Sequence, residues 1–209
     1  MNALAQPTII HALLELRDDS GRLLHNISLQ ENTLHGALHS YDDAGQISQR
    51  AVYHNGVRHG LSEYFNGPLP QMQQQFVNGI PHGPTKVFDA AGNLSAELSY
   101  VSGQLAGEAR YYAQGRLVRR ANYRAGKLDG LVEDFGVDGT LLQRATYQAN
   151  ALNGPSLRYW PNGQIMERVD FDRGLIQGTA RQFDQNGKPL GDPGPNLVRR
   201  VEQLFRGES

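Results

Sequence analysis

Apolar and polar residues alternate along short segments of this chain, and the alternation returns at a fixed interval. Within residues 94–100, the apolar residues Leu94, Ala96, Leu98 and Tyr100 occupy every second position. A period of two over so short a run predicts a β-strand with one apolar face. Similar runs return every 23 or 24 residues. The pattern therefore predicts a repeat array.

Glycines and aromatic residues mark the interval. A hinge glycine opens each repeat, one aromatic residue follows five positions later, and a second follows after 16 or 17 positions. With a degenerate unit before the first hinge and a half-unit after the last, we expect about seven to eight repeats. The hinge glycines are Gly36, Gly60, Gly83, Gly107, Gly130, Gly154 and Gly178.

Two kinds of turn separate the expected strands. Residues 43–45 and their equivalents have the form of a three-residue loop closed by a left-handed glycine, which would pair Tyr41 with Ile47 on one face. A second turn, typified by residues 54–56, follows each second aromatic. Residues 67–70 depart from this pattern, so the register there stays open. We also expect each hinge glycine to let a neighbouring aromatic ring lie close over the backbone.

These elements predict an all-β fold. We expect an elongated single-layer antiparallel meander of β-hairpin repeats over residues 1–190, advancing roughly 10 Å per repeat. Such arrays need capped ends. Residues 191–209 are expected to form a linker and a C-terminal capping helix over the last hairpin, with Asn196 as its N-cap and Gly207 as its stop.

Composition narrows the function classes. The 209 residues carry a net charge of −1 and no cysteine. Thiol nucleophiles, disulfides and thiolate metal sites are thereby excluded. The near-zero net charge predicts no nucleic-acid partner. The first residues lack the basic region of a signal peptide, and no run reaches the length of a membrane span. We therefore expect a cytoplasmic protein.

The polar residues suggest no catalytic chemistry. His35, His59 and His82 each precede a hinge glycine, so they should lie roughly 10 Å apart, too far to share a metal ion. Asp42 and Asp89, and their equivalents, precede turn glycines and are expected to cap turn amides. We expect no enzymatic activity, no metal site, no cofactor and no small-molecule substrate.

Binding is the remaining class of function. A single-layer sheet leaves apolar surface open for a partner. Aromatic residues outside the two columns, and an arginine-rich cluster at residues 110–127, suit an acidic protein surface, RNA or lipid headgroups. The alternatives are structural packing of the rings and a solvated basic edge balanced by residues 129–138. The predicted binding residues are Tyr64, Arg110, Tyr111, Arg119, Arg120, Arg124 and Trp160.

Residues 53–60 and 159–165 resemble the MORN repeat variant (membrane occupation and recognition nexus), and the resemblance extends over about residues 12–190. The repeat length is similar to that of bacterial antitoxin or immunity partners of secreted toxins. The resemblance implies a non-catalytic protein-binding module that neutralises a cognate toxin domain. The alternative is a peripheral membrane scaffold that binds anionic lipid headgroups, against which the net charge of −1 weighs.

Overall fold

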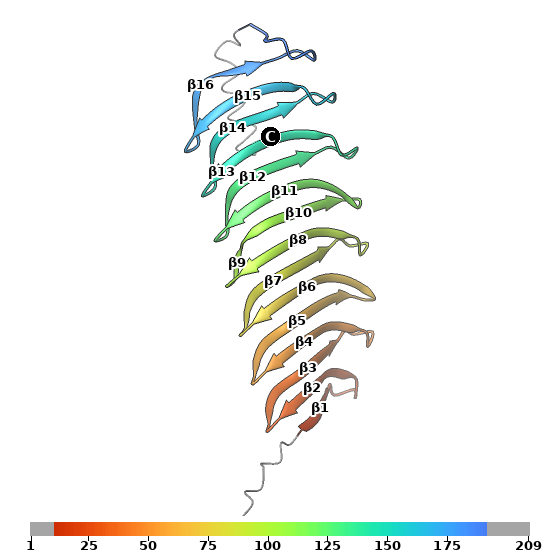
Figure 1. The fold of residues 1–209 in the computed structure, drawn as a ribbon. Helices are drawn as coiled ribbons and strands as arrows, with labels where there is room; N and C mark the ends of the chain where they lie inside the picture. Colours follow the sequence, from red (N-terminus) through yellow and green to blue (C-terminus); the bar gives the residue numbers. More distant parts are fainter. Residues whose placement is uncertain (1–10, 192–209) are drawn as a thin grey trace, which may run out of the picture. The chain divides into compact units, whose positions relative to one another are not determined.

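A computed structural model describes residues 11–191 of the chain. The chain divides into two compact units, Met1–Gln104 and Leu105–Ser209. In each unit, curved strands are joined by turns at both ends (Figure 1). Each strand contacts mainly the strands before and after it in the chain, so each unit is a single-layer antiparallel meander, as predicted.

The first unit runs from β1 to β8, with neighbouring strands antiparallel throughout. A two-residue strand, β9 (Gln104–Leu105), lies at the unit boundary. The strands are β1 (His11–Arg17), β2 (Leu23–Gln30), β3 (Thr33–Tyr41), β4 (Ile47–His54), β5 (Val57–Asn66), β6 (Leu69–Val77), β7 (Ile80–Phe88) and β8 (Leu94–Val101).

The second unit continues the same hairpin pattern from β10 to β16. Its strands are β10 (Gly107–Ala113), β11 (Arg116–Arg124), β12 (Lys127–Phe135), β13 (Leu141–Gln148), β14 (Ala151–Tyr159), β15 (Ile165–Asp172) and β16 (Leu175–Gln182).

The three-residue loops form as predicted. Gly45 has a φ of 75° and its N–H donates to the carbonyl of Asp42 at 3.0 Å. Tyr41 pairs with Ile47, which places both on one face. The Asp42 carboxylate accepts the backbone N–H of Ala44 at 2.9 Å, so its turn-capping role is confirmed.

The irregular segment resolves into a tight two-residue turn. Asn66 pairs with Leu69, and Phe65 pairs with Pro70. Gly67 provides the positive φ, 56°, that this shorter turn needs. The repeat therefore loses residues in the turn while its strands keep their partners.

The hinge glycines from Gly36 to Gly154 each lie directly opposite the second aromatic residue of their repeat, so the expected aromatic neighbour is present. Gly130 has a φ of 115°, and a Cβ built there would lie 3.1 Å from the Cβ of Asn122 on the preceding strand. At Gly36 the corresponding contact is Ser28 Cβ at 3.2 Å. A side chain at these positions would be strained and crowded by the previous strand, not by an aromatic ring.

Strand register gives each unit two faces, because directly opposed residues point the same way. In the second unit we call one the tyrosine face, defined by Tyr111, Tyr123 and Tyr147, and the other the ladder face, defined by Arg120 and Glu133. The hydrophobic core of this unit lies on the tyrosine face. It consists of buried Ala145, Leu152, Val169, Phe171 and Ala180, with Tyr147 and Ile176 packed against them.

The predicted fold class was wrong in including a C-terminal capping helix. The described residues contain strands and turns and no helix. After β16, Phe183 bridges Pro189, and the N–H of Leu190 donates to the carbonyl of Gln182 at 2.8 Å. A non-helical return segment therefore pairs with the end of the last described hairpin. The proposed helix, residues 196–206, lies outside the described residues, and the predicted boundary at 190/191 stays a prediction.

Candidate binding site

A row of charged side chains crosses the ladder face of the second unit. Arg110 on β10 pairs with Arg120 on β11, which pairs with Glu133 on β12, which pairs with Arg144 on β13. Because directly opposed side chains are close neighbours, like charges in such a row repel and opposite charges attract. Glu133 is the single carboxylate of this row and lies between Arg120 and Arg144.

Glu133 is bound from both sides. Its side chain is only 2% exposed. Arg120 donates from Nε to Oε2 at 2.9 Å and also from Nη2, while Arg144 donates to Oε1 at 2.9 and 2.7 Å. Burial alone would raise the pKa of Glu133, but the hydrogen bonds and charges of the two arginines outweigh it, so the pKa lies below its ordinary value. Glu133 is therefore a charged, fully engaged structural group.

The other predicted arginines also carry carboxylate partners. Arg110 lies 2.7 Å from Glu108, Arg119 lies 2.9 Å from Asp134, and Arg124 lies 3.3 Å from Asp129. The cluster is thus an array of ion pairs. This geometry favours the balanced-edge interpretation over an uncompensated basic patch, whereas the role of these arginines in binding stays a prediction.

The tyrosine face holds two of the predicted residues together. The hydroxyls of Tyr111 and Tyr123 lie 3.1 Å apart, and Tyr111 is directly opposite Arg119. Burial raises the pKa of Asp134 above its ordinary value, and the charge of Arg119 opposes that rise in part. Burial likewise raises the pKa of Tyr147. Arg119 and Arg120 are consecutive in β11 and lie on opposite faces, a separation that strand alternation alone could have shown.

Tyr64 and Trp160 lie apart from this group. Tyr64 belongs to the first unit, where Arg58 Nη1 donates to its hydroxyl at 2.7 Å. Trp160 lies at a turn of the second unit, and its Nε1 donates to the carbonyl of Phe183 at 3.0 Å. The contact of Tyr64 lies within β5, whereas that of Trp160 joins its turn to the residue after β16. Within the second unit, the predicted binding residues are divided between the tyrosine face, the ladder face and a turn.

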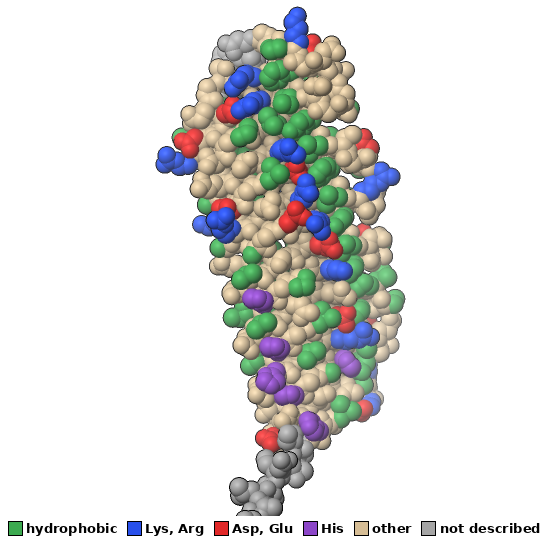
Figure 2. All heavy atoms as spheres, in the orientation of Figure 1, with side chains coloured by type: hydrophobic (Ala, Val, Ile, Leu, Met, Phe, Trp, Pro, Cys, Tyr) green, Lys and Arg blue, Asp and Glu red, His purple; other side chains and the backbone are tan. Residues whose placement is uncertain are grey.

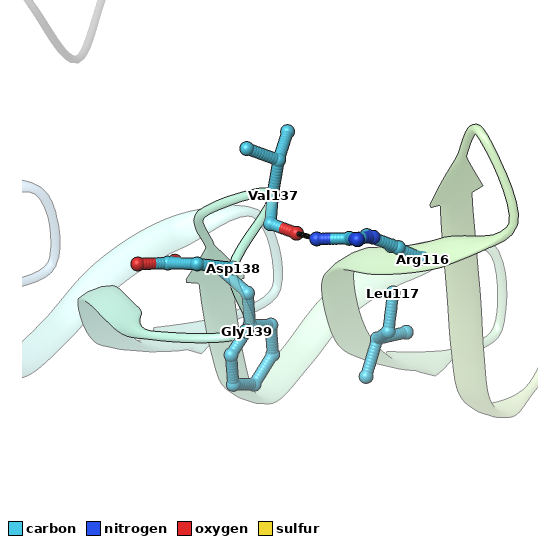
Figure 3. A pocket seen from close by; sticks show the side chains of 6 residues that line it. Arg116, Leu117, Val137, Asp138 and Gly139 are labelled. Carbon is cyan, nitrogen blue, oxygen red and sulfur yellow. Dashed lines mark hydrogen bonds between the residues drawn. The ribbon is translucent and has the colours of Figure 1, made fainter.

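A pocket that the sequence did not suggest opens between the turn at residues 114–115 and the turn at residues 137–139. We call this edge of the second unit, where β10 turns into β11 and β12 into β13, the turn edge. The pocket has a volume of about 420 Å³, and we call it the turn pocket. Arg116 reaches across it, and its Nη1 donates to the carbonyl of Val137 (Figure 3). The lining residues are Arg116, Leu117, Phe135, Val137, Asp138 and Gly139.

A second pocket, of about 330 Å³, lies at the next turn edge along the chain. At its rim, a side-chain hydrogen bond from Asn162 Nδ2 to the carbonyl of Gln185, at 2.7 Å, joins two successive turns. The lining residues are Thr140, Leu141, Tyr159, Trp160, Pro161, Asn162 and Gly163. Tyr159 is one of the five-position aromatics, so the aromatic column supplies part of this pocket.

Histidines gather in the first unit, whereas positive and negative side chains intermix over the second (Figure 2). The rings of His35 and His54 lie 4.8 Å apart, and those of His54 and His59 lie 6.1 Å apart. His54 fills the space between the repeat-equivalent histidines, which spacing alone did not reveal. Even so, no group of three or more potential ligands within residues 11–191 is placed to hold a metal ion.

The described part of the chain contains no helix long and apolar enough to cross a membrane. Comparison with curated proteins found no match. Among solved structures, the chain is similar to one entitled "Crystal Structure of TarM", with 16% identity and a TM-score of 0.33. That similarity covers 58% of this chain and 22% of the other, and it is too slight to carry an argument.

Two stretches match a family at the level of the single repeat. Residues 81–102, in the first unit, and residues 152–173, in the second, match the MORN repeat variant. Each stretch runs from just before a hinge glycine to just after the second aromatic residue. A MORN repeat variant is thus found in each of the two units.

Proposed function

We propose that this chain is a non-catalytic protein-binding repeat module, an immunity or antitoxin protein that binds and neutralises a cognate bacterial toxin domain in the cytoplasm. MORN repeats are generally protein- or lipid-binding modules. The observation that carries the proposal is the open sheet of the second unit, where arginine–carboxylate pairs alternate with half-buried tyrosines. Tyrosine and arginine are the side chains most enriched at protein interfaces.

The pairing of charges favours a protein over an anionic bilayer. Attraction to acidic lipids amounts to about 1 kcal/mol for each basic residue near the surface. Here Arg110, Arg119, Arg120 and Arg124 each lie within 4 Å of a carboxylate, which cancels much of that attraction. Ion pairs of this kind can instead be shared with, or exchanged for, charged side chains of a protein partner. The alternative function is a peripheral membrane scaffold that binds anionic lipid headgroups.

Titration calorimetry with a candidate toxin domain, sought first in the gene next to this one, tests the proposal. We expect saturable binding, and growth rescue when the two proteins are co-expressed. Tyr111→Ala or Arg119→Ala should weaken binding by roughly 2 kcal/mol if the tyrosine face is used. Arg110→Ala, on the ladder face, is the matched control. The absence of toxin binding, together with strong salt-sensitive co-sedimentation on phosphatidylserine vesicles, would contradict the proposal and support the membrane scaffold.

A further inference from the structure

The turn pocket arises because successive hairpins separate beyond their last paired residues. Between β11 and β12, the outermost pair at this edge is Arg119 with Asp134. Leu117 and Phe135 lie beyond that pair, facing each other across a gap with no backbone pairing. The floor of the pocket is therefore apolar. Its mouth lies between the two turns, and a Cβ built at Gly139 would meet no atom within 4 Å.

Two of the equivalent gaps in the first unit are narrowed by side chains. At Gly92 the Cδ2 of Leu69 would lie 3.1 Å from a built Cβ, and at Gly67 the Oε1 of Gln46 would lie 3.5 Å away. Each of these side chains comes from the neighbouring turn and occupies the space that is empty at Gly139. At Gly45 of the first unit, as at Gly139, a built Cβ would meet no atom within 4 Å, whereas at Gly187 of the second unit the Oε1 of Gln164 would lie 3.3 Å away. The openness of each gap therefore depends on the side chains of the neighbouring turn.

Arg116 has an equivalent in the first unit, Arg22, whose positive charge is balanced by nearby carboxylates. Arg22 also follows a turn glycine, and its Nη1 likewise donates to a carbonyl across the gap, that of Asp43, at 3.2 Å. Asp43 adds a carboxylate at 2.8 Å, and Asp18 supplies another at 3.0 Å. At the position of Asp43, the second unit has Val137.

Arg116 has no such close carboxylate partner among residues 11–191, although its charge acts on Asp138 from a longer distance. No carboxylate in the described residues forms an ion pair with it. Asp138 lines the pocket but its carboxylate points away from Arg116 (Figure 3). That carboxylate accepts hydrogen bonds from the backbone N–H and hydroxyl of Thr140 at 3.0 and 2.6 Å, and the hydroxyl bond chiefly holds its pKa below the ordinary value.

The two pockets of this edge are one repeat apart, a distance of roughly 10 Å for two strands. An extended partner segment in polyproline II geometry advances about 3.1 Å per residue and has three residues per turn. Side chains three residues apart in such a segment point the same way, separated by about 9 Å. That spacing matches two pockets floored by Leu117 with Phe135 and by Leu141 with Tyr159.

We propose that the turn edge of the second unit binds an acidic, apolar polyproline-II segment of a protein partner. One apolar side chain fills the turn pocket, an adjacent aspartate or glutamate pairs with Arg116, and a second apolar side chain three residues away enters the pocket beside Tyr159. This rests on the proposed protein-binding function and specifies the kind of segment that is bound. Peptide docking of this kind exploits an already extended chain, which loses little entropy on binding.

Fluorescence anisotropy with a labelled synthetic peptide tests the proposal on the full chain. The probe is a proline-rich peptide with an aspartate beside the first of two leucines spaced three residues apart. We expect saturable binding that weakens about tenfold or more in Arg116→Gln, because a charge-assisted hydrogen bond is lost. Val137→Asp should weaken binding similarly, because it recreates the arrangement of Asp43 with Arg22. Arg22→Gln is the matched control and should leave binding unchanged.

The outcomes separate this proposal from the broader function. A peptide that fails to bind, or that binds Arg116→Gln and Val137→Asp as tightly as the original chain, would overturn the turn-edge site. If the toxin domain still binds such variants normally, the protein-binding function stands and only this site fails. If the peptide binds but the toxin does not, the toxin assignment fails. Binding of phosphatidylserine vesicles through Arg116, with no preference for aspartate over asparagine in the peptide, would overturn the peptide assignment.

Discussion

The two units are built from the same hairpin but stabilise their surfaces differently. At equivalent positions, Glu63 of the first unit has a side chain that is 20% exposed, whereas Glu133 of the second is 2% exposed. Glu63 accepts from Gln73 at 3.0 Å and lies 3.7 Å from Arg50, while Glu133 is held by two arginines through both oxygens. The recurring glycines and aromatic residues determine the hairpin backbone. The residues that vary between repeats determine how many hydrogen bonds and ion pairs stabilise each surface.

Apolar exposure differs in the same direction. The first unit leaves several aliphatic side chains exposed beside the turns at residues 55–56, 78–79 and 102–103. They include Val57, Val77, Ile80 and Val101, each between 41% and 51% exposed. The second unit also exposes Leu175 and Val137, at 70% and 64%, but it gathers other apolar side chains into a buried cluster around Phe171. We infer that the second unit is the more rigid platform, and the following substitutions test that difference.

The largest effect is expected in the apolar cluster. Phe171→Ala should lower the free energy of unfolding by about 3–5 kcal/mol, because Leu152 and Val169 cannot fill the cavity. Phe76→Ala is the matched change in the first unit, since Phe76 is also 7% exposed. The guanidinium of Arg58 lies 5.0 Å from the Phe76 ring and can collapse into the space, so we expect a smaller loss. Urea unfolding followed by circular dichroism measures both; equal losses would remove the distinction between the units.

The next effect concerns the charged row. Glu133→Ala should cost about 2 kcal/mol, because it removes charge-assisted hydrogen bonds and leaves Arg120 and Arg144 facing each other. The cost is limited because both arginines keep side chains more than 40% exposed. Glu63→Ala should cost less than about 1 kcal/mol. Thermal melting of the two variants compares them, and a larger loss at Glu63 would reverse the account.

Most of the fold could be predicted from the sequence, because glycine and turn chemistry act locally. Gly45 sets the loop that pairs Tyr41 with Ile47, and both the positive φ and the pairing are found. The segment that covers the last hairpin could not be predicted from local signals. A helix pattern after Pro195 does not indicate which residues pair with the end of β16. The elongated shape of the whole array stays a prediction.

The candidate site was harder to predict, because contacts across strands decide it. Sequence reasoning grouped Arg119 with Arg120, although strand alternation places them on opposite faces. It noted Arg116 in the basic cluster but not its pocket, whose clue is Val137 in place of the aspartate at position 43. Which arginine lacks an ion pair at close range depends on the twist and separation of neighbouring hairpins, and a linear pattern does not contain that information.

Acid should lower the free energy of unfolding of the second unit, because it protonates carboxylates that are hydrogen-bonded to arginines. Glu133 and Asp170 both have pKa values below their ordinary range, Asp170 chiefly because Arg168 donates hydrogen bonds to it. Their contribution to stability is present above the unfolded carboxylate pKa of about 4 and is lost as pH falls through the lower folded values. Asp134, with a raised pKa, acts in the opposite direction: its unfavourable contribution grows as pH rises through its folded pKa.

Urea unfolding between pH 7 and pH 3 measures this dependence. The single tryptophan, Trp160, reports on the second unit alone. Glu133→Gln should flatten the loss of stability toward low pH, and Asp134→Asn, which removes the opposing group, should steepen it. A pH profile unchanged by either substitution would show that these carboxylates do not set the acid sensitivity of the unit.

The smallest effect is expected at the exposed end of the cluster. Arg124 has a side chain that is 81% exposed and lies 3.3 Å from Asp129. Arg124→Ala should change the free energy of unfolding by less than about 0.5 kcal/mol, because solvent screens such a pair. A thermal melt checks this. A loss comparable to that of Glu133→Ala would mean that the ion pairs of this unit act as one coupled network.

Hydrogen exchange on the full chain, with and without a protein partner of the proposed toxin class, tests the central claim that the second unit is the partner-binding platform. We predict slower exchange of backbone amides in the second unit on binding, greatest at the turns of residues 114–116 and 137–139, with the first unit unchanged. Protection confined to the exposed aliphatic edge of the first unit, residues 57–101, would contradict the account and move the binding site to the other unit.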